Sequence, residues 1–86
     1  MKPLISIFCS GIRTHRWLDL YSSLTRSSIP FELIIVGNVV PQFSLPRNFH
    51  FIFSNVKPSQ CSEIASRYAT GDLLMNIADD LIFFNL

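Results

Sequence analysis

The chain has 86 residues, enough for one domain whose core stays marginal, because a domain this small leaves much of its surface in water. A net charge of +1 and the lack of a basic stripe argue against a nucleic-acid partner. Because 49% of the residues are apolar and only 15% are charged, we expect some apolar surface to pack against further polypeptide.

The two cysteines, Cys9 and Cys61, are too few for a disulfide framework and have no CxxC neighbour. We therefore expect both to be reduced, buried side chains in a cytoplasmic protein. No stretch of the chain reaches the roughly 18–20 apolar residues that cross a bilayer, so we expect no transmembrane segment.

The first predicted element is a buried strand over Leu4 to Cys9, a short apolar run that ends at Ser10-Gly11. The opening of the chain superficially resembles a signal peptide. The run is short, Ser6 interrupts it, and no small-x-small cleavage pattern follows. These features favour the strand over the signal peptide.

A helix is predicted from Thr14, because apolar residues then recur at helical spacing, at Trp17, Leu20, Tyr21 and Leu24. We expect Thr14 to be the N-cap. The sequence Ser27-Ser28-Ile29-Pro30 predicts the end of this helix.

Two further strands are predicted, one over Phe31 to Val36 and one over Phe49 to Phe53. Glu32 is the single polar residue of the first, which Gly37-Asn38 ends. The intervening residues 39–48 contain two prolines and are expected to form a loop. The alternating phenylalanines of the second strand indicate sheet packing rather than a base-stacking platform.

A second helix is predicted with Ser59 as its cap and Gly71 as its end, followed by a strand over Leu73 to Ile77. Its apolar stripe consists of Cys61, Ile64, Ala65 and Tyr68. The order β-α-β-β-α-β predicts one α/β domain over residues 1–86. We expect a Rossmann-like three-layer sandwich, a mostly parallel sheet of about four strands with two helices.

Polar residues follow three of the strands, and in an open α/β sheet ligands bind beyond the carboxyl ends of the strands. We therefore expect three segments to share one crevice, namely Ser10-Gly11-Ile12-Arg13, Gly37-Asn38 and Asp79-Asp80. Two carboxylates at a strand end are suitable ligands for Mg²⁺ or Mn²⁺. Neighbouring side chains on an extended chain point opposite ways, so one aspartate can bind metal and the other a ribose hydroxyl. Alternatively, one aspartate caps a turn and the other is solvated.

The cluster Arg13-Thr14-His15-Arg16 places cations at a helix N-terminus, which suits a bound anion, but side chains that extend into water are the favoured explanation. His15 and His50 have no carboxylate or cysteine partner at a meaningful spacing, and we interpret both as structural. A P-loop is excluded because no glycine precedes a lysine. A receiver-type domain is disfavoured because Ser10-Gly11 stands where its acidic pair belongs.

Together these segments resemble the first half of a family 2 glycosyltransferase with the GT-A fold. The strand Leu4 to Cys9, its loop Ser10 to Arg13 and the strand Phe31 to Val36 are similar to the family's opening. The most specific similarity is Tyr68-Ala69-Thr70-Gly71-Asp72-Leu73-Leu74-Met75-Asn76-Ile77-Ala78-Asp79-Asp80. It resembles the family's helix end, Ala-x-Gly-Asp turn, apolar strand and DxD-type motif.

The resemblance implies that Asp80 binds the metal and Asp79 lies near the ribose and metal. The first loop (Ser10, Gly11, Arg13) and the end of the second strand (Gly37, Asn38) would hold the nucleotide base. A Mn²⁺ or Mg²⁺ ion would bridge the diphosphate of a nucleotide-sugar donor while the sugar passes to an acceptor that the sequence does not identify.

Three positions differ from the family pattern. Ala78 replaces the first acid of the motif, Gly37 or Asn38 replaces an aspartate that reads the base, and Ser62-Glu63 replaces an Arg-Asn pair. The resemblance covers the first third to half of a usual catalytic domain, so we expect truncation after the DxD-like motif and no transferase turnover without the catalytic base. The alternative is a non-catalytic α/β binding or interaction module.

Overall fold

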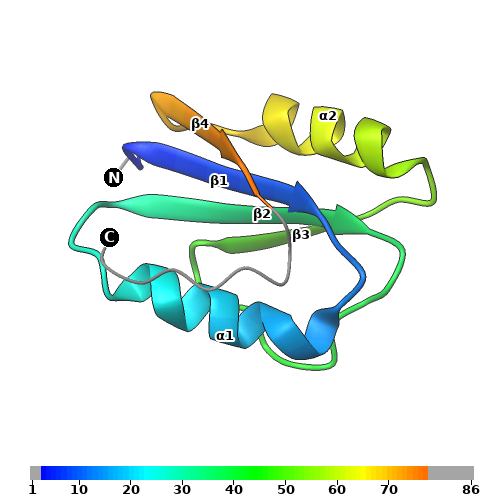
Figure 1. The fold of residues 1–86 in the computed structure, drawn as a ribbon, viewed down its shortest axis with the longest axis horizontal. Coiled ribbons are helices and arrows are strands. Elements are labelled where there is room, and N and C mark those ends of the chain that lie inside the picture. Colours follow the sequence, from blue (N-terminus) through cyan, green and yellow to red (C-terminus); the bar gives the residue numbers. More distant parts are fainter. Residues whose placement is uncertain (1–2, 78–86) are drawn as a thin grey trace.

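A computed structural model describes residues 3–77 and confirms the predicted α/β fold class (Figure 1). Four parallel strands form one sheet in the order β3-β2-β1-β4, with a helix on each face. The elements are β1 (Ile5–Ser10), α1 (Thr14–Thr25), β2 (Phe31–Gly37), β3 (Phe49–Phe53), α2 (Pro58–Tyr68) and β4 (Leu73–Asn76). The sheet is thus the middle of three layers.

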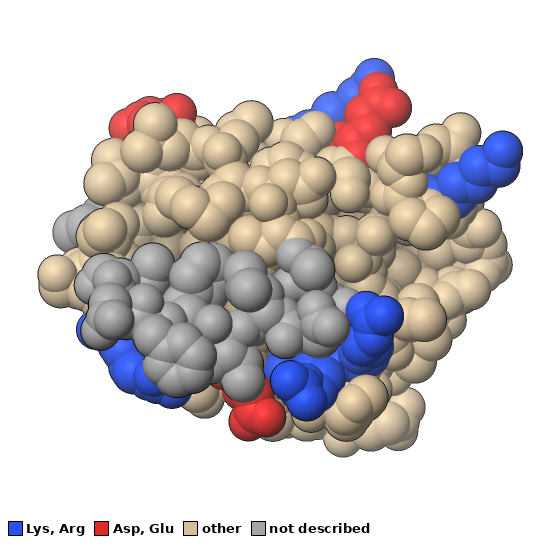
Figure 2. Space-filling view, viewed as in Figure 1, with Lys and Arg blue, Asp and Glu red and all other residues tan. Residues whose placement is uncertain are grey.

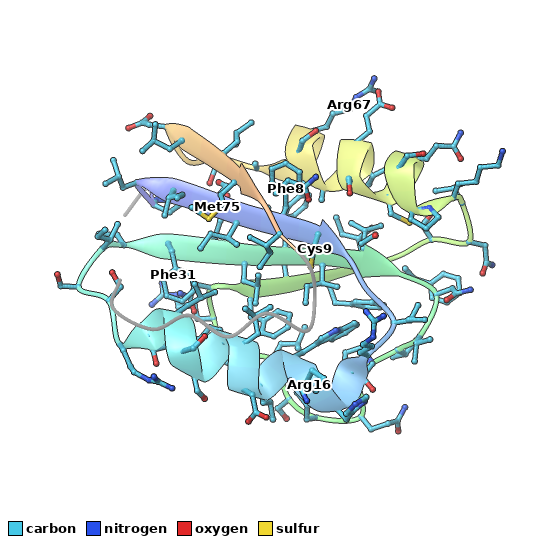
Figure 3. All side chains as sticks on the ribbon, viewed as in Figure 1. Phe8, Cys9, Arg16, Phe31, Arg67 and Met75 are labelled. Atoms are coloured by element: carbon cyan, nitrogen blue, oxygen red, sulfur yellow. The ribbon has the colours of Figure 1, made fainter. Side chains whose placement is uncertain are left out.

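The two central strands supply most of the core because both of their faces are covered. In β1, Phe8 packs toward α2, whereas its neighbour Cys9 packs toward α1 (Figure 3). In β2, Leu33 and Ile35 join the α1 side, and Ile34 and Val36 join the α2 side. Continuous apolar runs are typical of strands buried on both faces. Cys9 and Cys61 are buried and form no disulfide, as the sequence predicted.

Helix α1 packs on the sheet through fully buried Trp17, Leu20 and Leu24, as its periodicity predicted. Trp17 also contacts the ring of Phe49 at 6.4 Å between centroids. The predicted cap is wrong by one residue, since Arg13 occupies the N-cap position and makes no side-chain capping bond. Thr14 is therefore the first helical residue.

Helix α2 begins at Pro58, so the predicted cap at Ser59 is also wrong. Proline is favoured at the first helical position, where its missing N–H costs no intrahelical bond. The backbone N–H of Lys57, at the N-cap, donates to Oε1 of Gln60 at 3.3 Å. Ser59 consequently lies within the first turn of the helix. Helix α2 packs against the sheet through the buried side chains of Cys61 and Ala65.

The connection from β2 to β3 is a loop, as predicted, and it lies on the same side of the sheet as α1 (Figure 1). Its residues Phe43 and Leu45 pack against the α1-side core, where a helix would otherwise lie. Right-handed crossovers require this side, because the chain moves from β1 through β2 to β3 in one direction. Helix α2 then returns the chain across the sheet to β4, on the opposite face.

Strand β4 is an edge strand and ends at Asn76, one residue before the predicted end. Gly71 does not end α2, which already stops at Tyr68. Gly71 instead lies against β1, where an added Cβ would come within 2.7 Å of Ser6 Oγ and 2.9 Å of the Ile5 carbonyl carbon. A side chain at this position would therefore separate the turn from the sheet.

The face shown in Figure 2 carries its charged side chains mainly toward the margins of the described surface. This distribution agrees with the low share of charged residues in the sequence. Within residues 3–77, neither helix has the length and apolar content that crossing a bilayer requires.

Candidate functional site

The strand order places a topological switch point between β1 and β4. From β1 the chain moves outward to β2 and β3, and it then crosses back to β4 on the other side of β1. Helix α1, which follows β1, and helix α2, which leads into β4, lie on opposite faces of the sheet. Such a point opens a crevice beyond the carboxyl ends of the strands, where open α/β sheets bind ligands.

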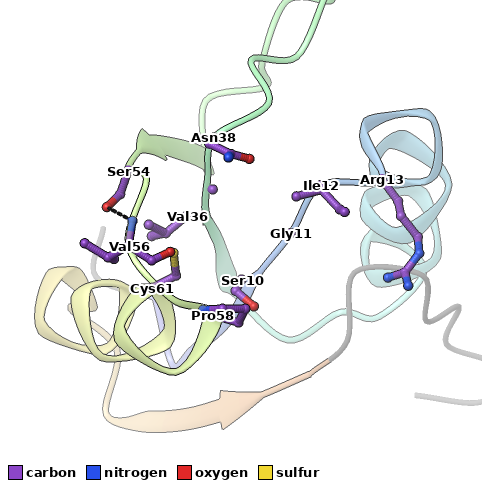
Figure 4. Close-up of a pocket in the computed structure, with 11 residues that line it drawn as sticks. Ser10, Gly11, Ile12, Arg13, Val36, Asn38, Ser54, Val56, Pro58 and Cys61 are labelled. Atoms are coloured by element: carbon purple, nitrogen blue, oxygen red, sulfur yellow. Dashed lines mark hydrogen bonds between the residues drawn. The ribbon is translucent and has the colours of Figure 1, made fainter.

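One cavity, of about 340 Å³, lies at the carboxyl ends of β1, β2 and β3 (Figure 4). Val36, Val56 and Cys61 contribute apolar walls, and Asn38 and Ser54 contribute polar groups. Figure 4 shows Ser54, Val56 and Cys61 at one end of this cavity and Arg13 at the other, beside α1. The cavity therefore combines apolar walls with a few polar groups, as small-molecule sites commonly do.

Gly37 allows the strand ends to approach closely at this cavity. The Gly11 N–H donates to the Val36 carbonyl at 3.1 Å, which extends the pairing of β1 with β2 by one residue. A Cβ on Gly37 would lie 2.1 Å from the Gly11 carbonyl oxygen, a distance that backbone cannot accommodate. Gly37 also accepts a bond from the Ser54 N–H at 2.9 Å. Backbone therefore forms much of the cavity wall.

A second cavity, of about 380 Å³, lies at the switch point itself. It shares Ser10, Arg13 and Pro58 with the first cavity, so the two are adjacent, and together they are called the crevice below. Its remaining lining comes from the first turns of α2 and the end of β4, at Ser59, Ser62, Asn76 and Ile77. Hydroxyl and amide groups thus surround the end of β4.

The described part of the crevice is positive rather than negative. Arg13 is the one charged residue among the described residues that line the two cavities. The N-terminal end of α2, with Pro58 and Ser59, adds the positive end of a helix dipole. This arrangement favours an anionic ligand.

Five of the predicted site residues, Ser10, Gly11, Arg13, Gly37 and Asn38, line the first cavity together. The other two, Asp79 and Asp80, lie outside the described residues. Within residues 3–77, no three His, Cys, Asp or Glu side chains gather as a metal site. Both aspartates follow closely after Ile77, which lines the second cavity.

Sequence reasoning missed several lining residues. Ser54 and Asn76 stand at the carboxyl ends of β3 and β4, so the strand-end argument that selected Ser10 and Asn38 also applies to them. Ser59 and Ser62 could not be found in this way. Their place depends on which turn of α2 faces the switch point, and only the packing of the helix decides that.

A larger hollow, of about 670 Å³, lies at the opposite, amino edge of the sheet. Its most buried polar group is the Glu32 carboxylate, and its other lining residues include Arg47, His50 and Thr70. Burial raises the pKa of Glu32, but hydrogen bonds from Ser6 and Thr70 and the nearby His50 outweigh burial and hold this pKa below its ordinary value. The carboxylate is already hydrogen-bonded within the protein, so the size of this hollow does not make it the better ligand site.

Comparison with models of known protein families gives no match, and comparison with curated proteins likewise gives no significant relative. The function therefore has to be argued from the crevice itself.

Proposed function

We propose that the crevice at the carboxyl edge binds the nucleoside diphosphate part of a nucleotide-sugar donor, as in a GT-A-type glycosyltransferase. The observation that carries the proposal is that five residues from two distant loops, selected from the sequence, line a single cavity. The cavity lies on one crevice with the switch point, which is where the fold class binds nucleotides.

The two cavities differ in a way that suits the two parts of such a ligand. The first has apolar walls at Val36 and Val56, together with the amide of Asn38, and suits a base. The second has Arg13 and the hydroxyls of Ser59 and Ser62, and suits phosphate oxygens. We assign the base to the first cavity and the diphosphate to the second.

A divalent metal fits this assignment, because Mg²⁺-type ions commonly use one or two carboxylates together with substrate phosphates. Asp79 and Asp80, which follow β4 in the sequence, are the proposed ligands. The metal would neutralise the diphosphate leaving group. In the family that the sequence resembles, the catalytic base belongs to a later segment, so we expect binding without sugar transfer by residues 1–86 alone.

Calorimetric titration of the purified chain with UDP, GDP or dTDP, each with and without Mn²⁺, tests the proposal. We expect one diphosphate to bind with Mn²⁺ and affinity to fall about tenfold or more in Asp80→Ala, since charged contacts contribute about 1.5–3 kcal/mol. Arg13→Ala should also weaken binding, whereas the matched control Arg26→Ala, at the exposed C-cap of α1, should not.

The alternative, a non-catalytic α/β binding or interaction module, gives a different result in the same titration. Metal-independent binding that Asp80→Ala leaves unchanged would support the module. A folded chain that binds none of the diphosphates would contradict the transferase-type site.

A further inference from the structure

Packing of its own side chains determines the register of β4 only weakly, because all four residues of the strand are exposed. Its three apolar residues, Leu73, Leu74 and Met75, are 56%, 56% and 36% exposed, and they alternate between the two faces of the sheet. Register is strongly specified where one face is buried and the other is polar. A shift of β4 by one residue would exchange one exposed apolar side chain of the strand for another. The loss of packing would fall mainly on Ile77, the residue after the strand, which lies against the α1-side core.

A buried polar cluster at the start of β4 fixes the register that side-chain packing determines only weakly. It consists of Ser6 on β1, Glu32 on β2 and the turn residues Thr70 and Gly71. Ser6 Oγ donates to Glu32 Oε2 at 2.6 Å and accepts from the Gly71 N–H at 2.7 Å. Glu32 Oε2 also accepts from the N–H of Thr70 at 2.7 Å and from its hydroxyl at 3.0 Å.

These bonds hold one end of β4 at a fixed position on the central strands. Ser6 is fully buried and Glu32 is 6% exposed, so a displaced turn would take both Thr70 donors from Glu32 and the Gly71 donor from Ser6, where water does not readily replace them. The close contact of Gly71 with Ser6 limits the turn further. In the register so defined, Leu73 pairs with Ile5 and Asn76 pairs with Phe8.

We propose that the Ser6–Glu32–Thr70–Gly71 cluster sets the register of β4 and thereby positions the carboxyl end of that strand in the ligand crevice. The cluster acts from the amino edge of the sheet, and its members are positioning residues. The inference rests on the proposed function only for its effect on ligand binding. Its effect on β4 is independent of any ligand.

The consequence for the crevice follows from the period of a strand. A slip of one residue turns every side chain of the strand to the other face. Asn76, which lines the second cavity, would then leave it. A change at Glu32 should therefore weaken ligand binding without touching the ligand.

Amide hydrogen exchange followed by NMR tests the effect on β4. The reporters are the N–H groups of Leu73 and Ile77, which donate at 3.0 Å to the carbonyls of Leu4, just before β1, and of Phe8 on β1. The reference is the Leu33 N–H, which donates to the Asn48 carbonyl. In Ser6→Ala, exchange at the two reporters should quicken about tenfold more than at the reference, the factor for losing one bond to a charged group.

The matched control is Ser23→Ala, another buried serine, which donates to Leu20 within α1 and should change the reporters and the reference alike. If Ser6→Ala does not fold, Glu32→Gln is measured instead, since it keeps the shape and removes the charge. Equal acceleration at reporters and reference, or none, would overturn the proposal.

Titration with Mn²⁺ and the preferred nucleoside diphosphate gives the second readout. We expect Glu32→Gln to weaken binding several-fold, while Glu63→Gln, on the exposed face of α2, leaves it unchanged. If the wild-type chain binds no diphosphate, the proposed function fails, and the exchange experiment still decides the role of the cluster. Unchanged affinity in Glu32→Gln would refute the link to the crevice.

Discussion

The two edges of the sheet use polar residues in opposite ways. At the amino edge, Ser6 and Thr70 donate their hydrogen bonds to the Glu32 carboxylate, so these donors are already engaged within the protein. At the carboxyl edge, no hydrogen bond within the described residues engages the side chains of Asn38 and Asn76, which line the crevice. Satisfied polar groups stabilise a fold, whereas unsatisfied ones at a surface are available to a ligand.

A larger cavity volume does not by itself identify a ligand site. The amino-edge hollow has a larger volume than either carboxyl-edge cavity, about 670 Å³ against 340 and 380 Å³. Its carboxylate nevertheless already has three donors from the protein. Changes at the amino edge should therefore act first on stability, and changes at the carboxyl edge first on binding.

The largest loss of stability is expected at a glycine of the carboxyl edge, which is an exception to this division between the two edges. Gly37→Ala would bring a Cβ to 2.1 Å from the Gly11 carbonyl, and neither backbone can move without disturbing a strand end. We expect a loss of about 3 kcal/mol or more, measured by urea unfolding. A loss under about 1 kcal/mol would show that the strand ends are not held together.

A smaller loss is expected for the corresponding glycine of the amino edge. In Gly71→Ala the nearest atom, at 2.7 Å, is the hydroxyl oxygen of Ser6, and the next are backbone atoms of β1. Strain of this kind costs about 1–3 kcal/mol. Urea unfolding gives the cost, and an unchanged midpoint would mean that the turn does not press on β1.

Lowering the pH should reduce the contribution of the amino edge to folding stability. The pKa of Glu32 is lowered on folding, so its stabilising contribution is complete above its ordinary pKa of about 4.5 and is lost as pH falls through the lower folded value. Glu32→Gln should lower the free energy of unfolding by about 1 kcal/mol at neutral pH, which is the difference between charged and neutral hydrogen bonds. The loss should be smaller at a pH below the folded pKa of Glu32. Unfolding curves at several pH values check this, with exposed Glu63→Gln as control. Parallel pH profiles for wild type and Glu32→Gln would contradict it.

The smallest effect on stability is expected at the carboxyl edge, in Asn38→Ala. Asn38 is exposed and lies in the loop after β2, so unfolding should change by less than about 0.5 kcal/mol. Diphosphate affinity should fall roughly three- to tenfold, the worth of one neutral hydrogen bond. A loss of stability with unchanged affinity would reverse the assignment of the two edges.

Much of the fold was predictable because its patterns are local. The apolar runs located all four strands, and helical spacing located Trp17, Leu20 and Leu24 on the buried face of α1. The predicted N-cap was wrong by one residue for α1 and by two for α2, although Pro58 was a readable signal for the start of α2. From the sequence, Glu32 was recognised only as a polar interruption of a strand, because its partners Ser6 and Thr70 are distant in sequence.

The site was predictable only in part. The strand-end argument found Ser10, Gly37 and Asn38 because it needs only the strand boundaries. The order β3-β2-β1-β4, and with it the switch point, depends on which strands pair, and no local pattern contains that. The roles assigned to Asp79 and Asp80 stay predictions, since both lie outside the described residues.

The most direct test of ligand binding at the carboxyl edge is an NMR titration of the ¹⁵N-labelled chain with Mg²⁺ and a nucleoside diphosphate. We predict that the amide signals of Ser10, Gly11, Gly37 and Asn38 shift together and saturate, while those around His50 and Arg47 stay in place. Shifts centred on the amino-edge hollow, or none at millimolar ligand, would contradict it.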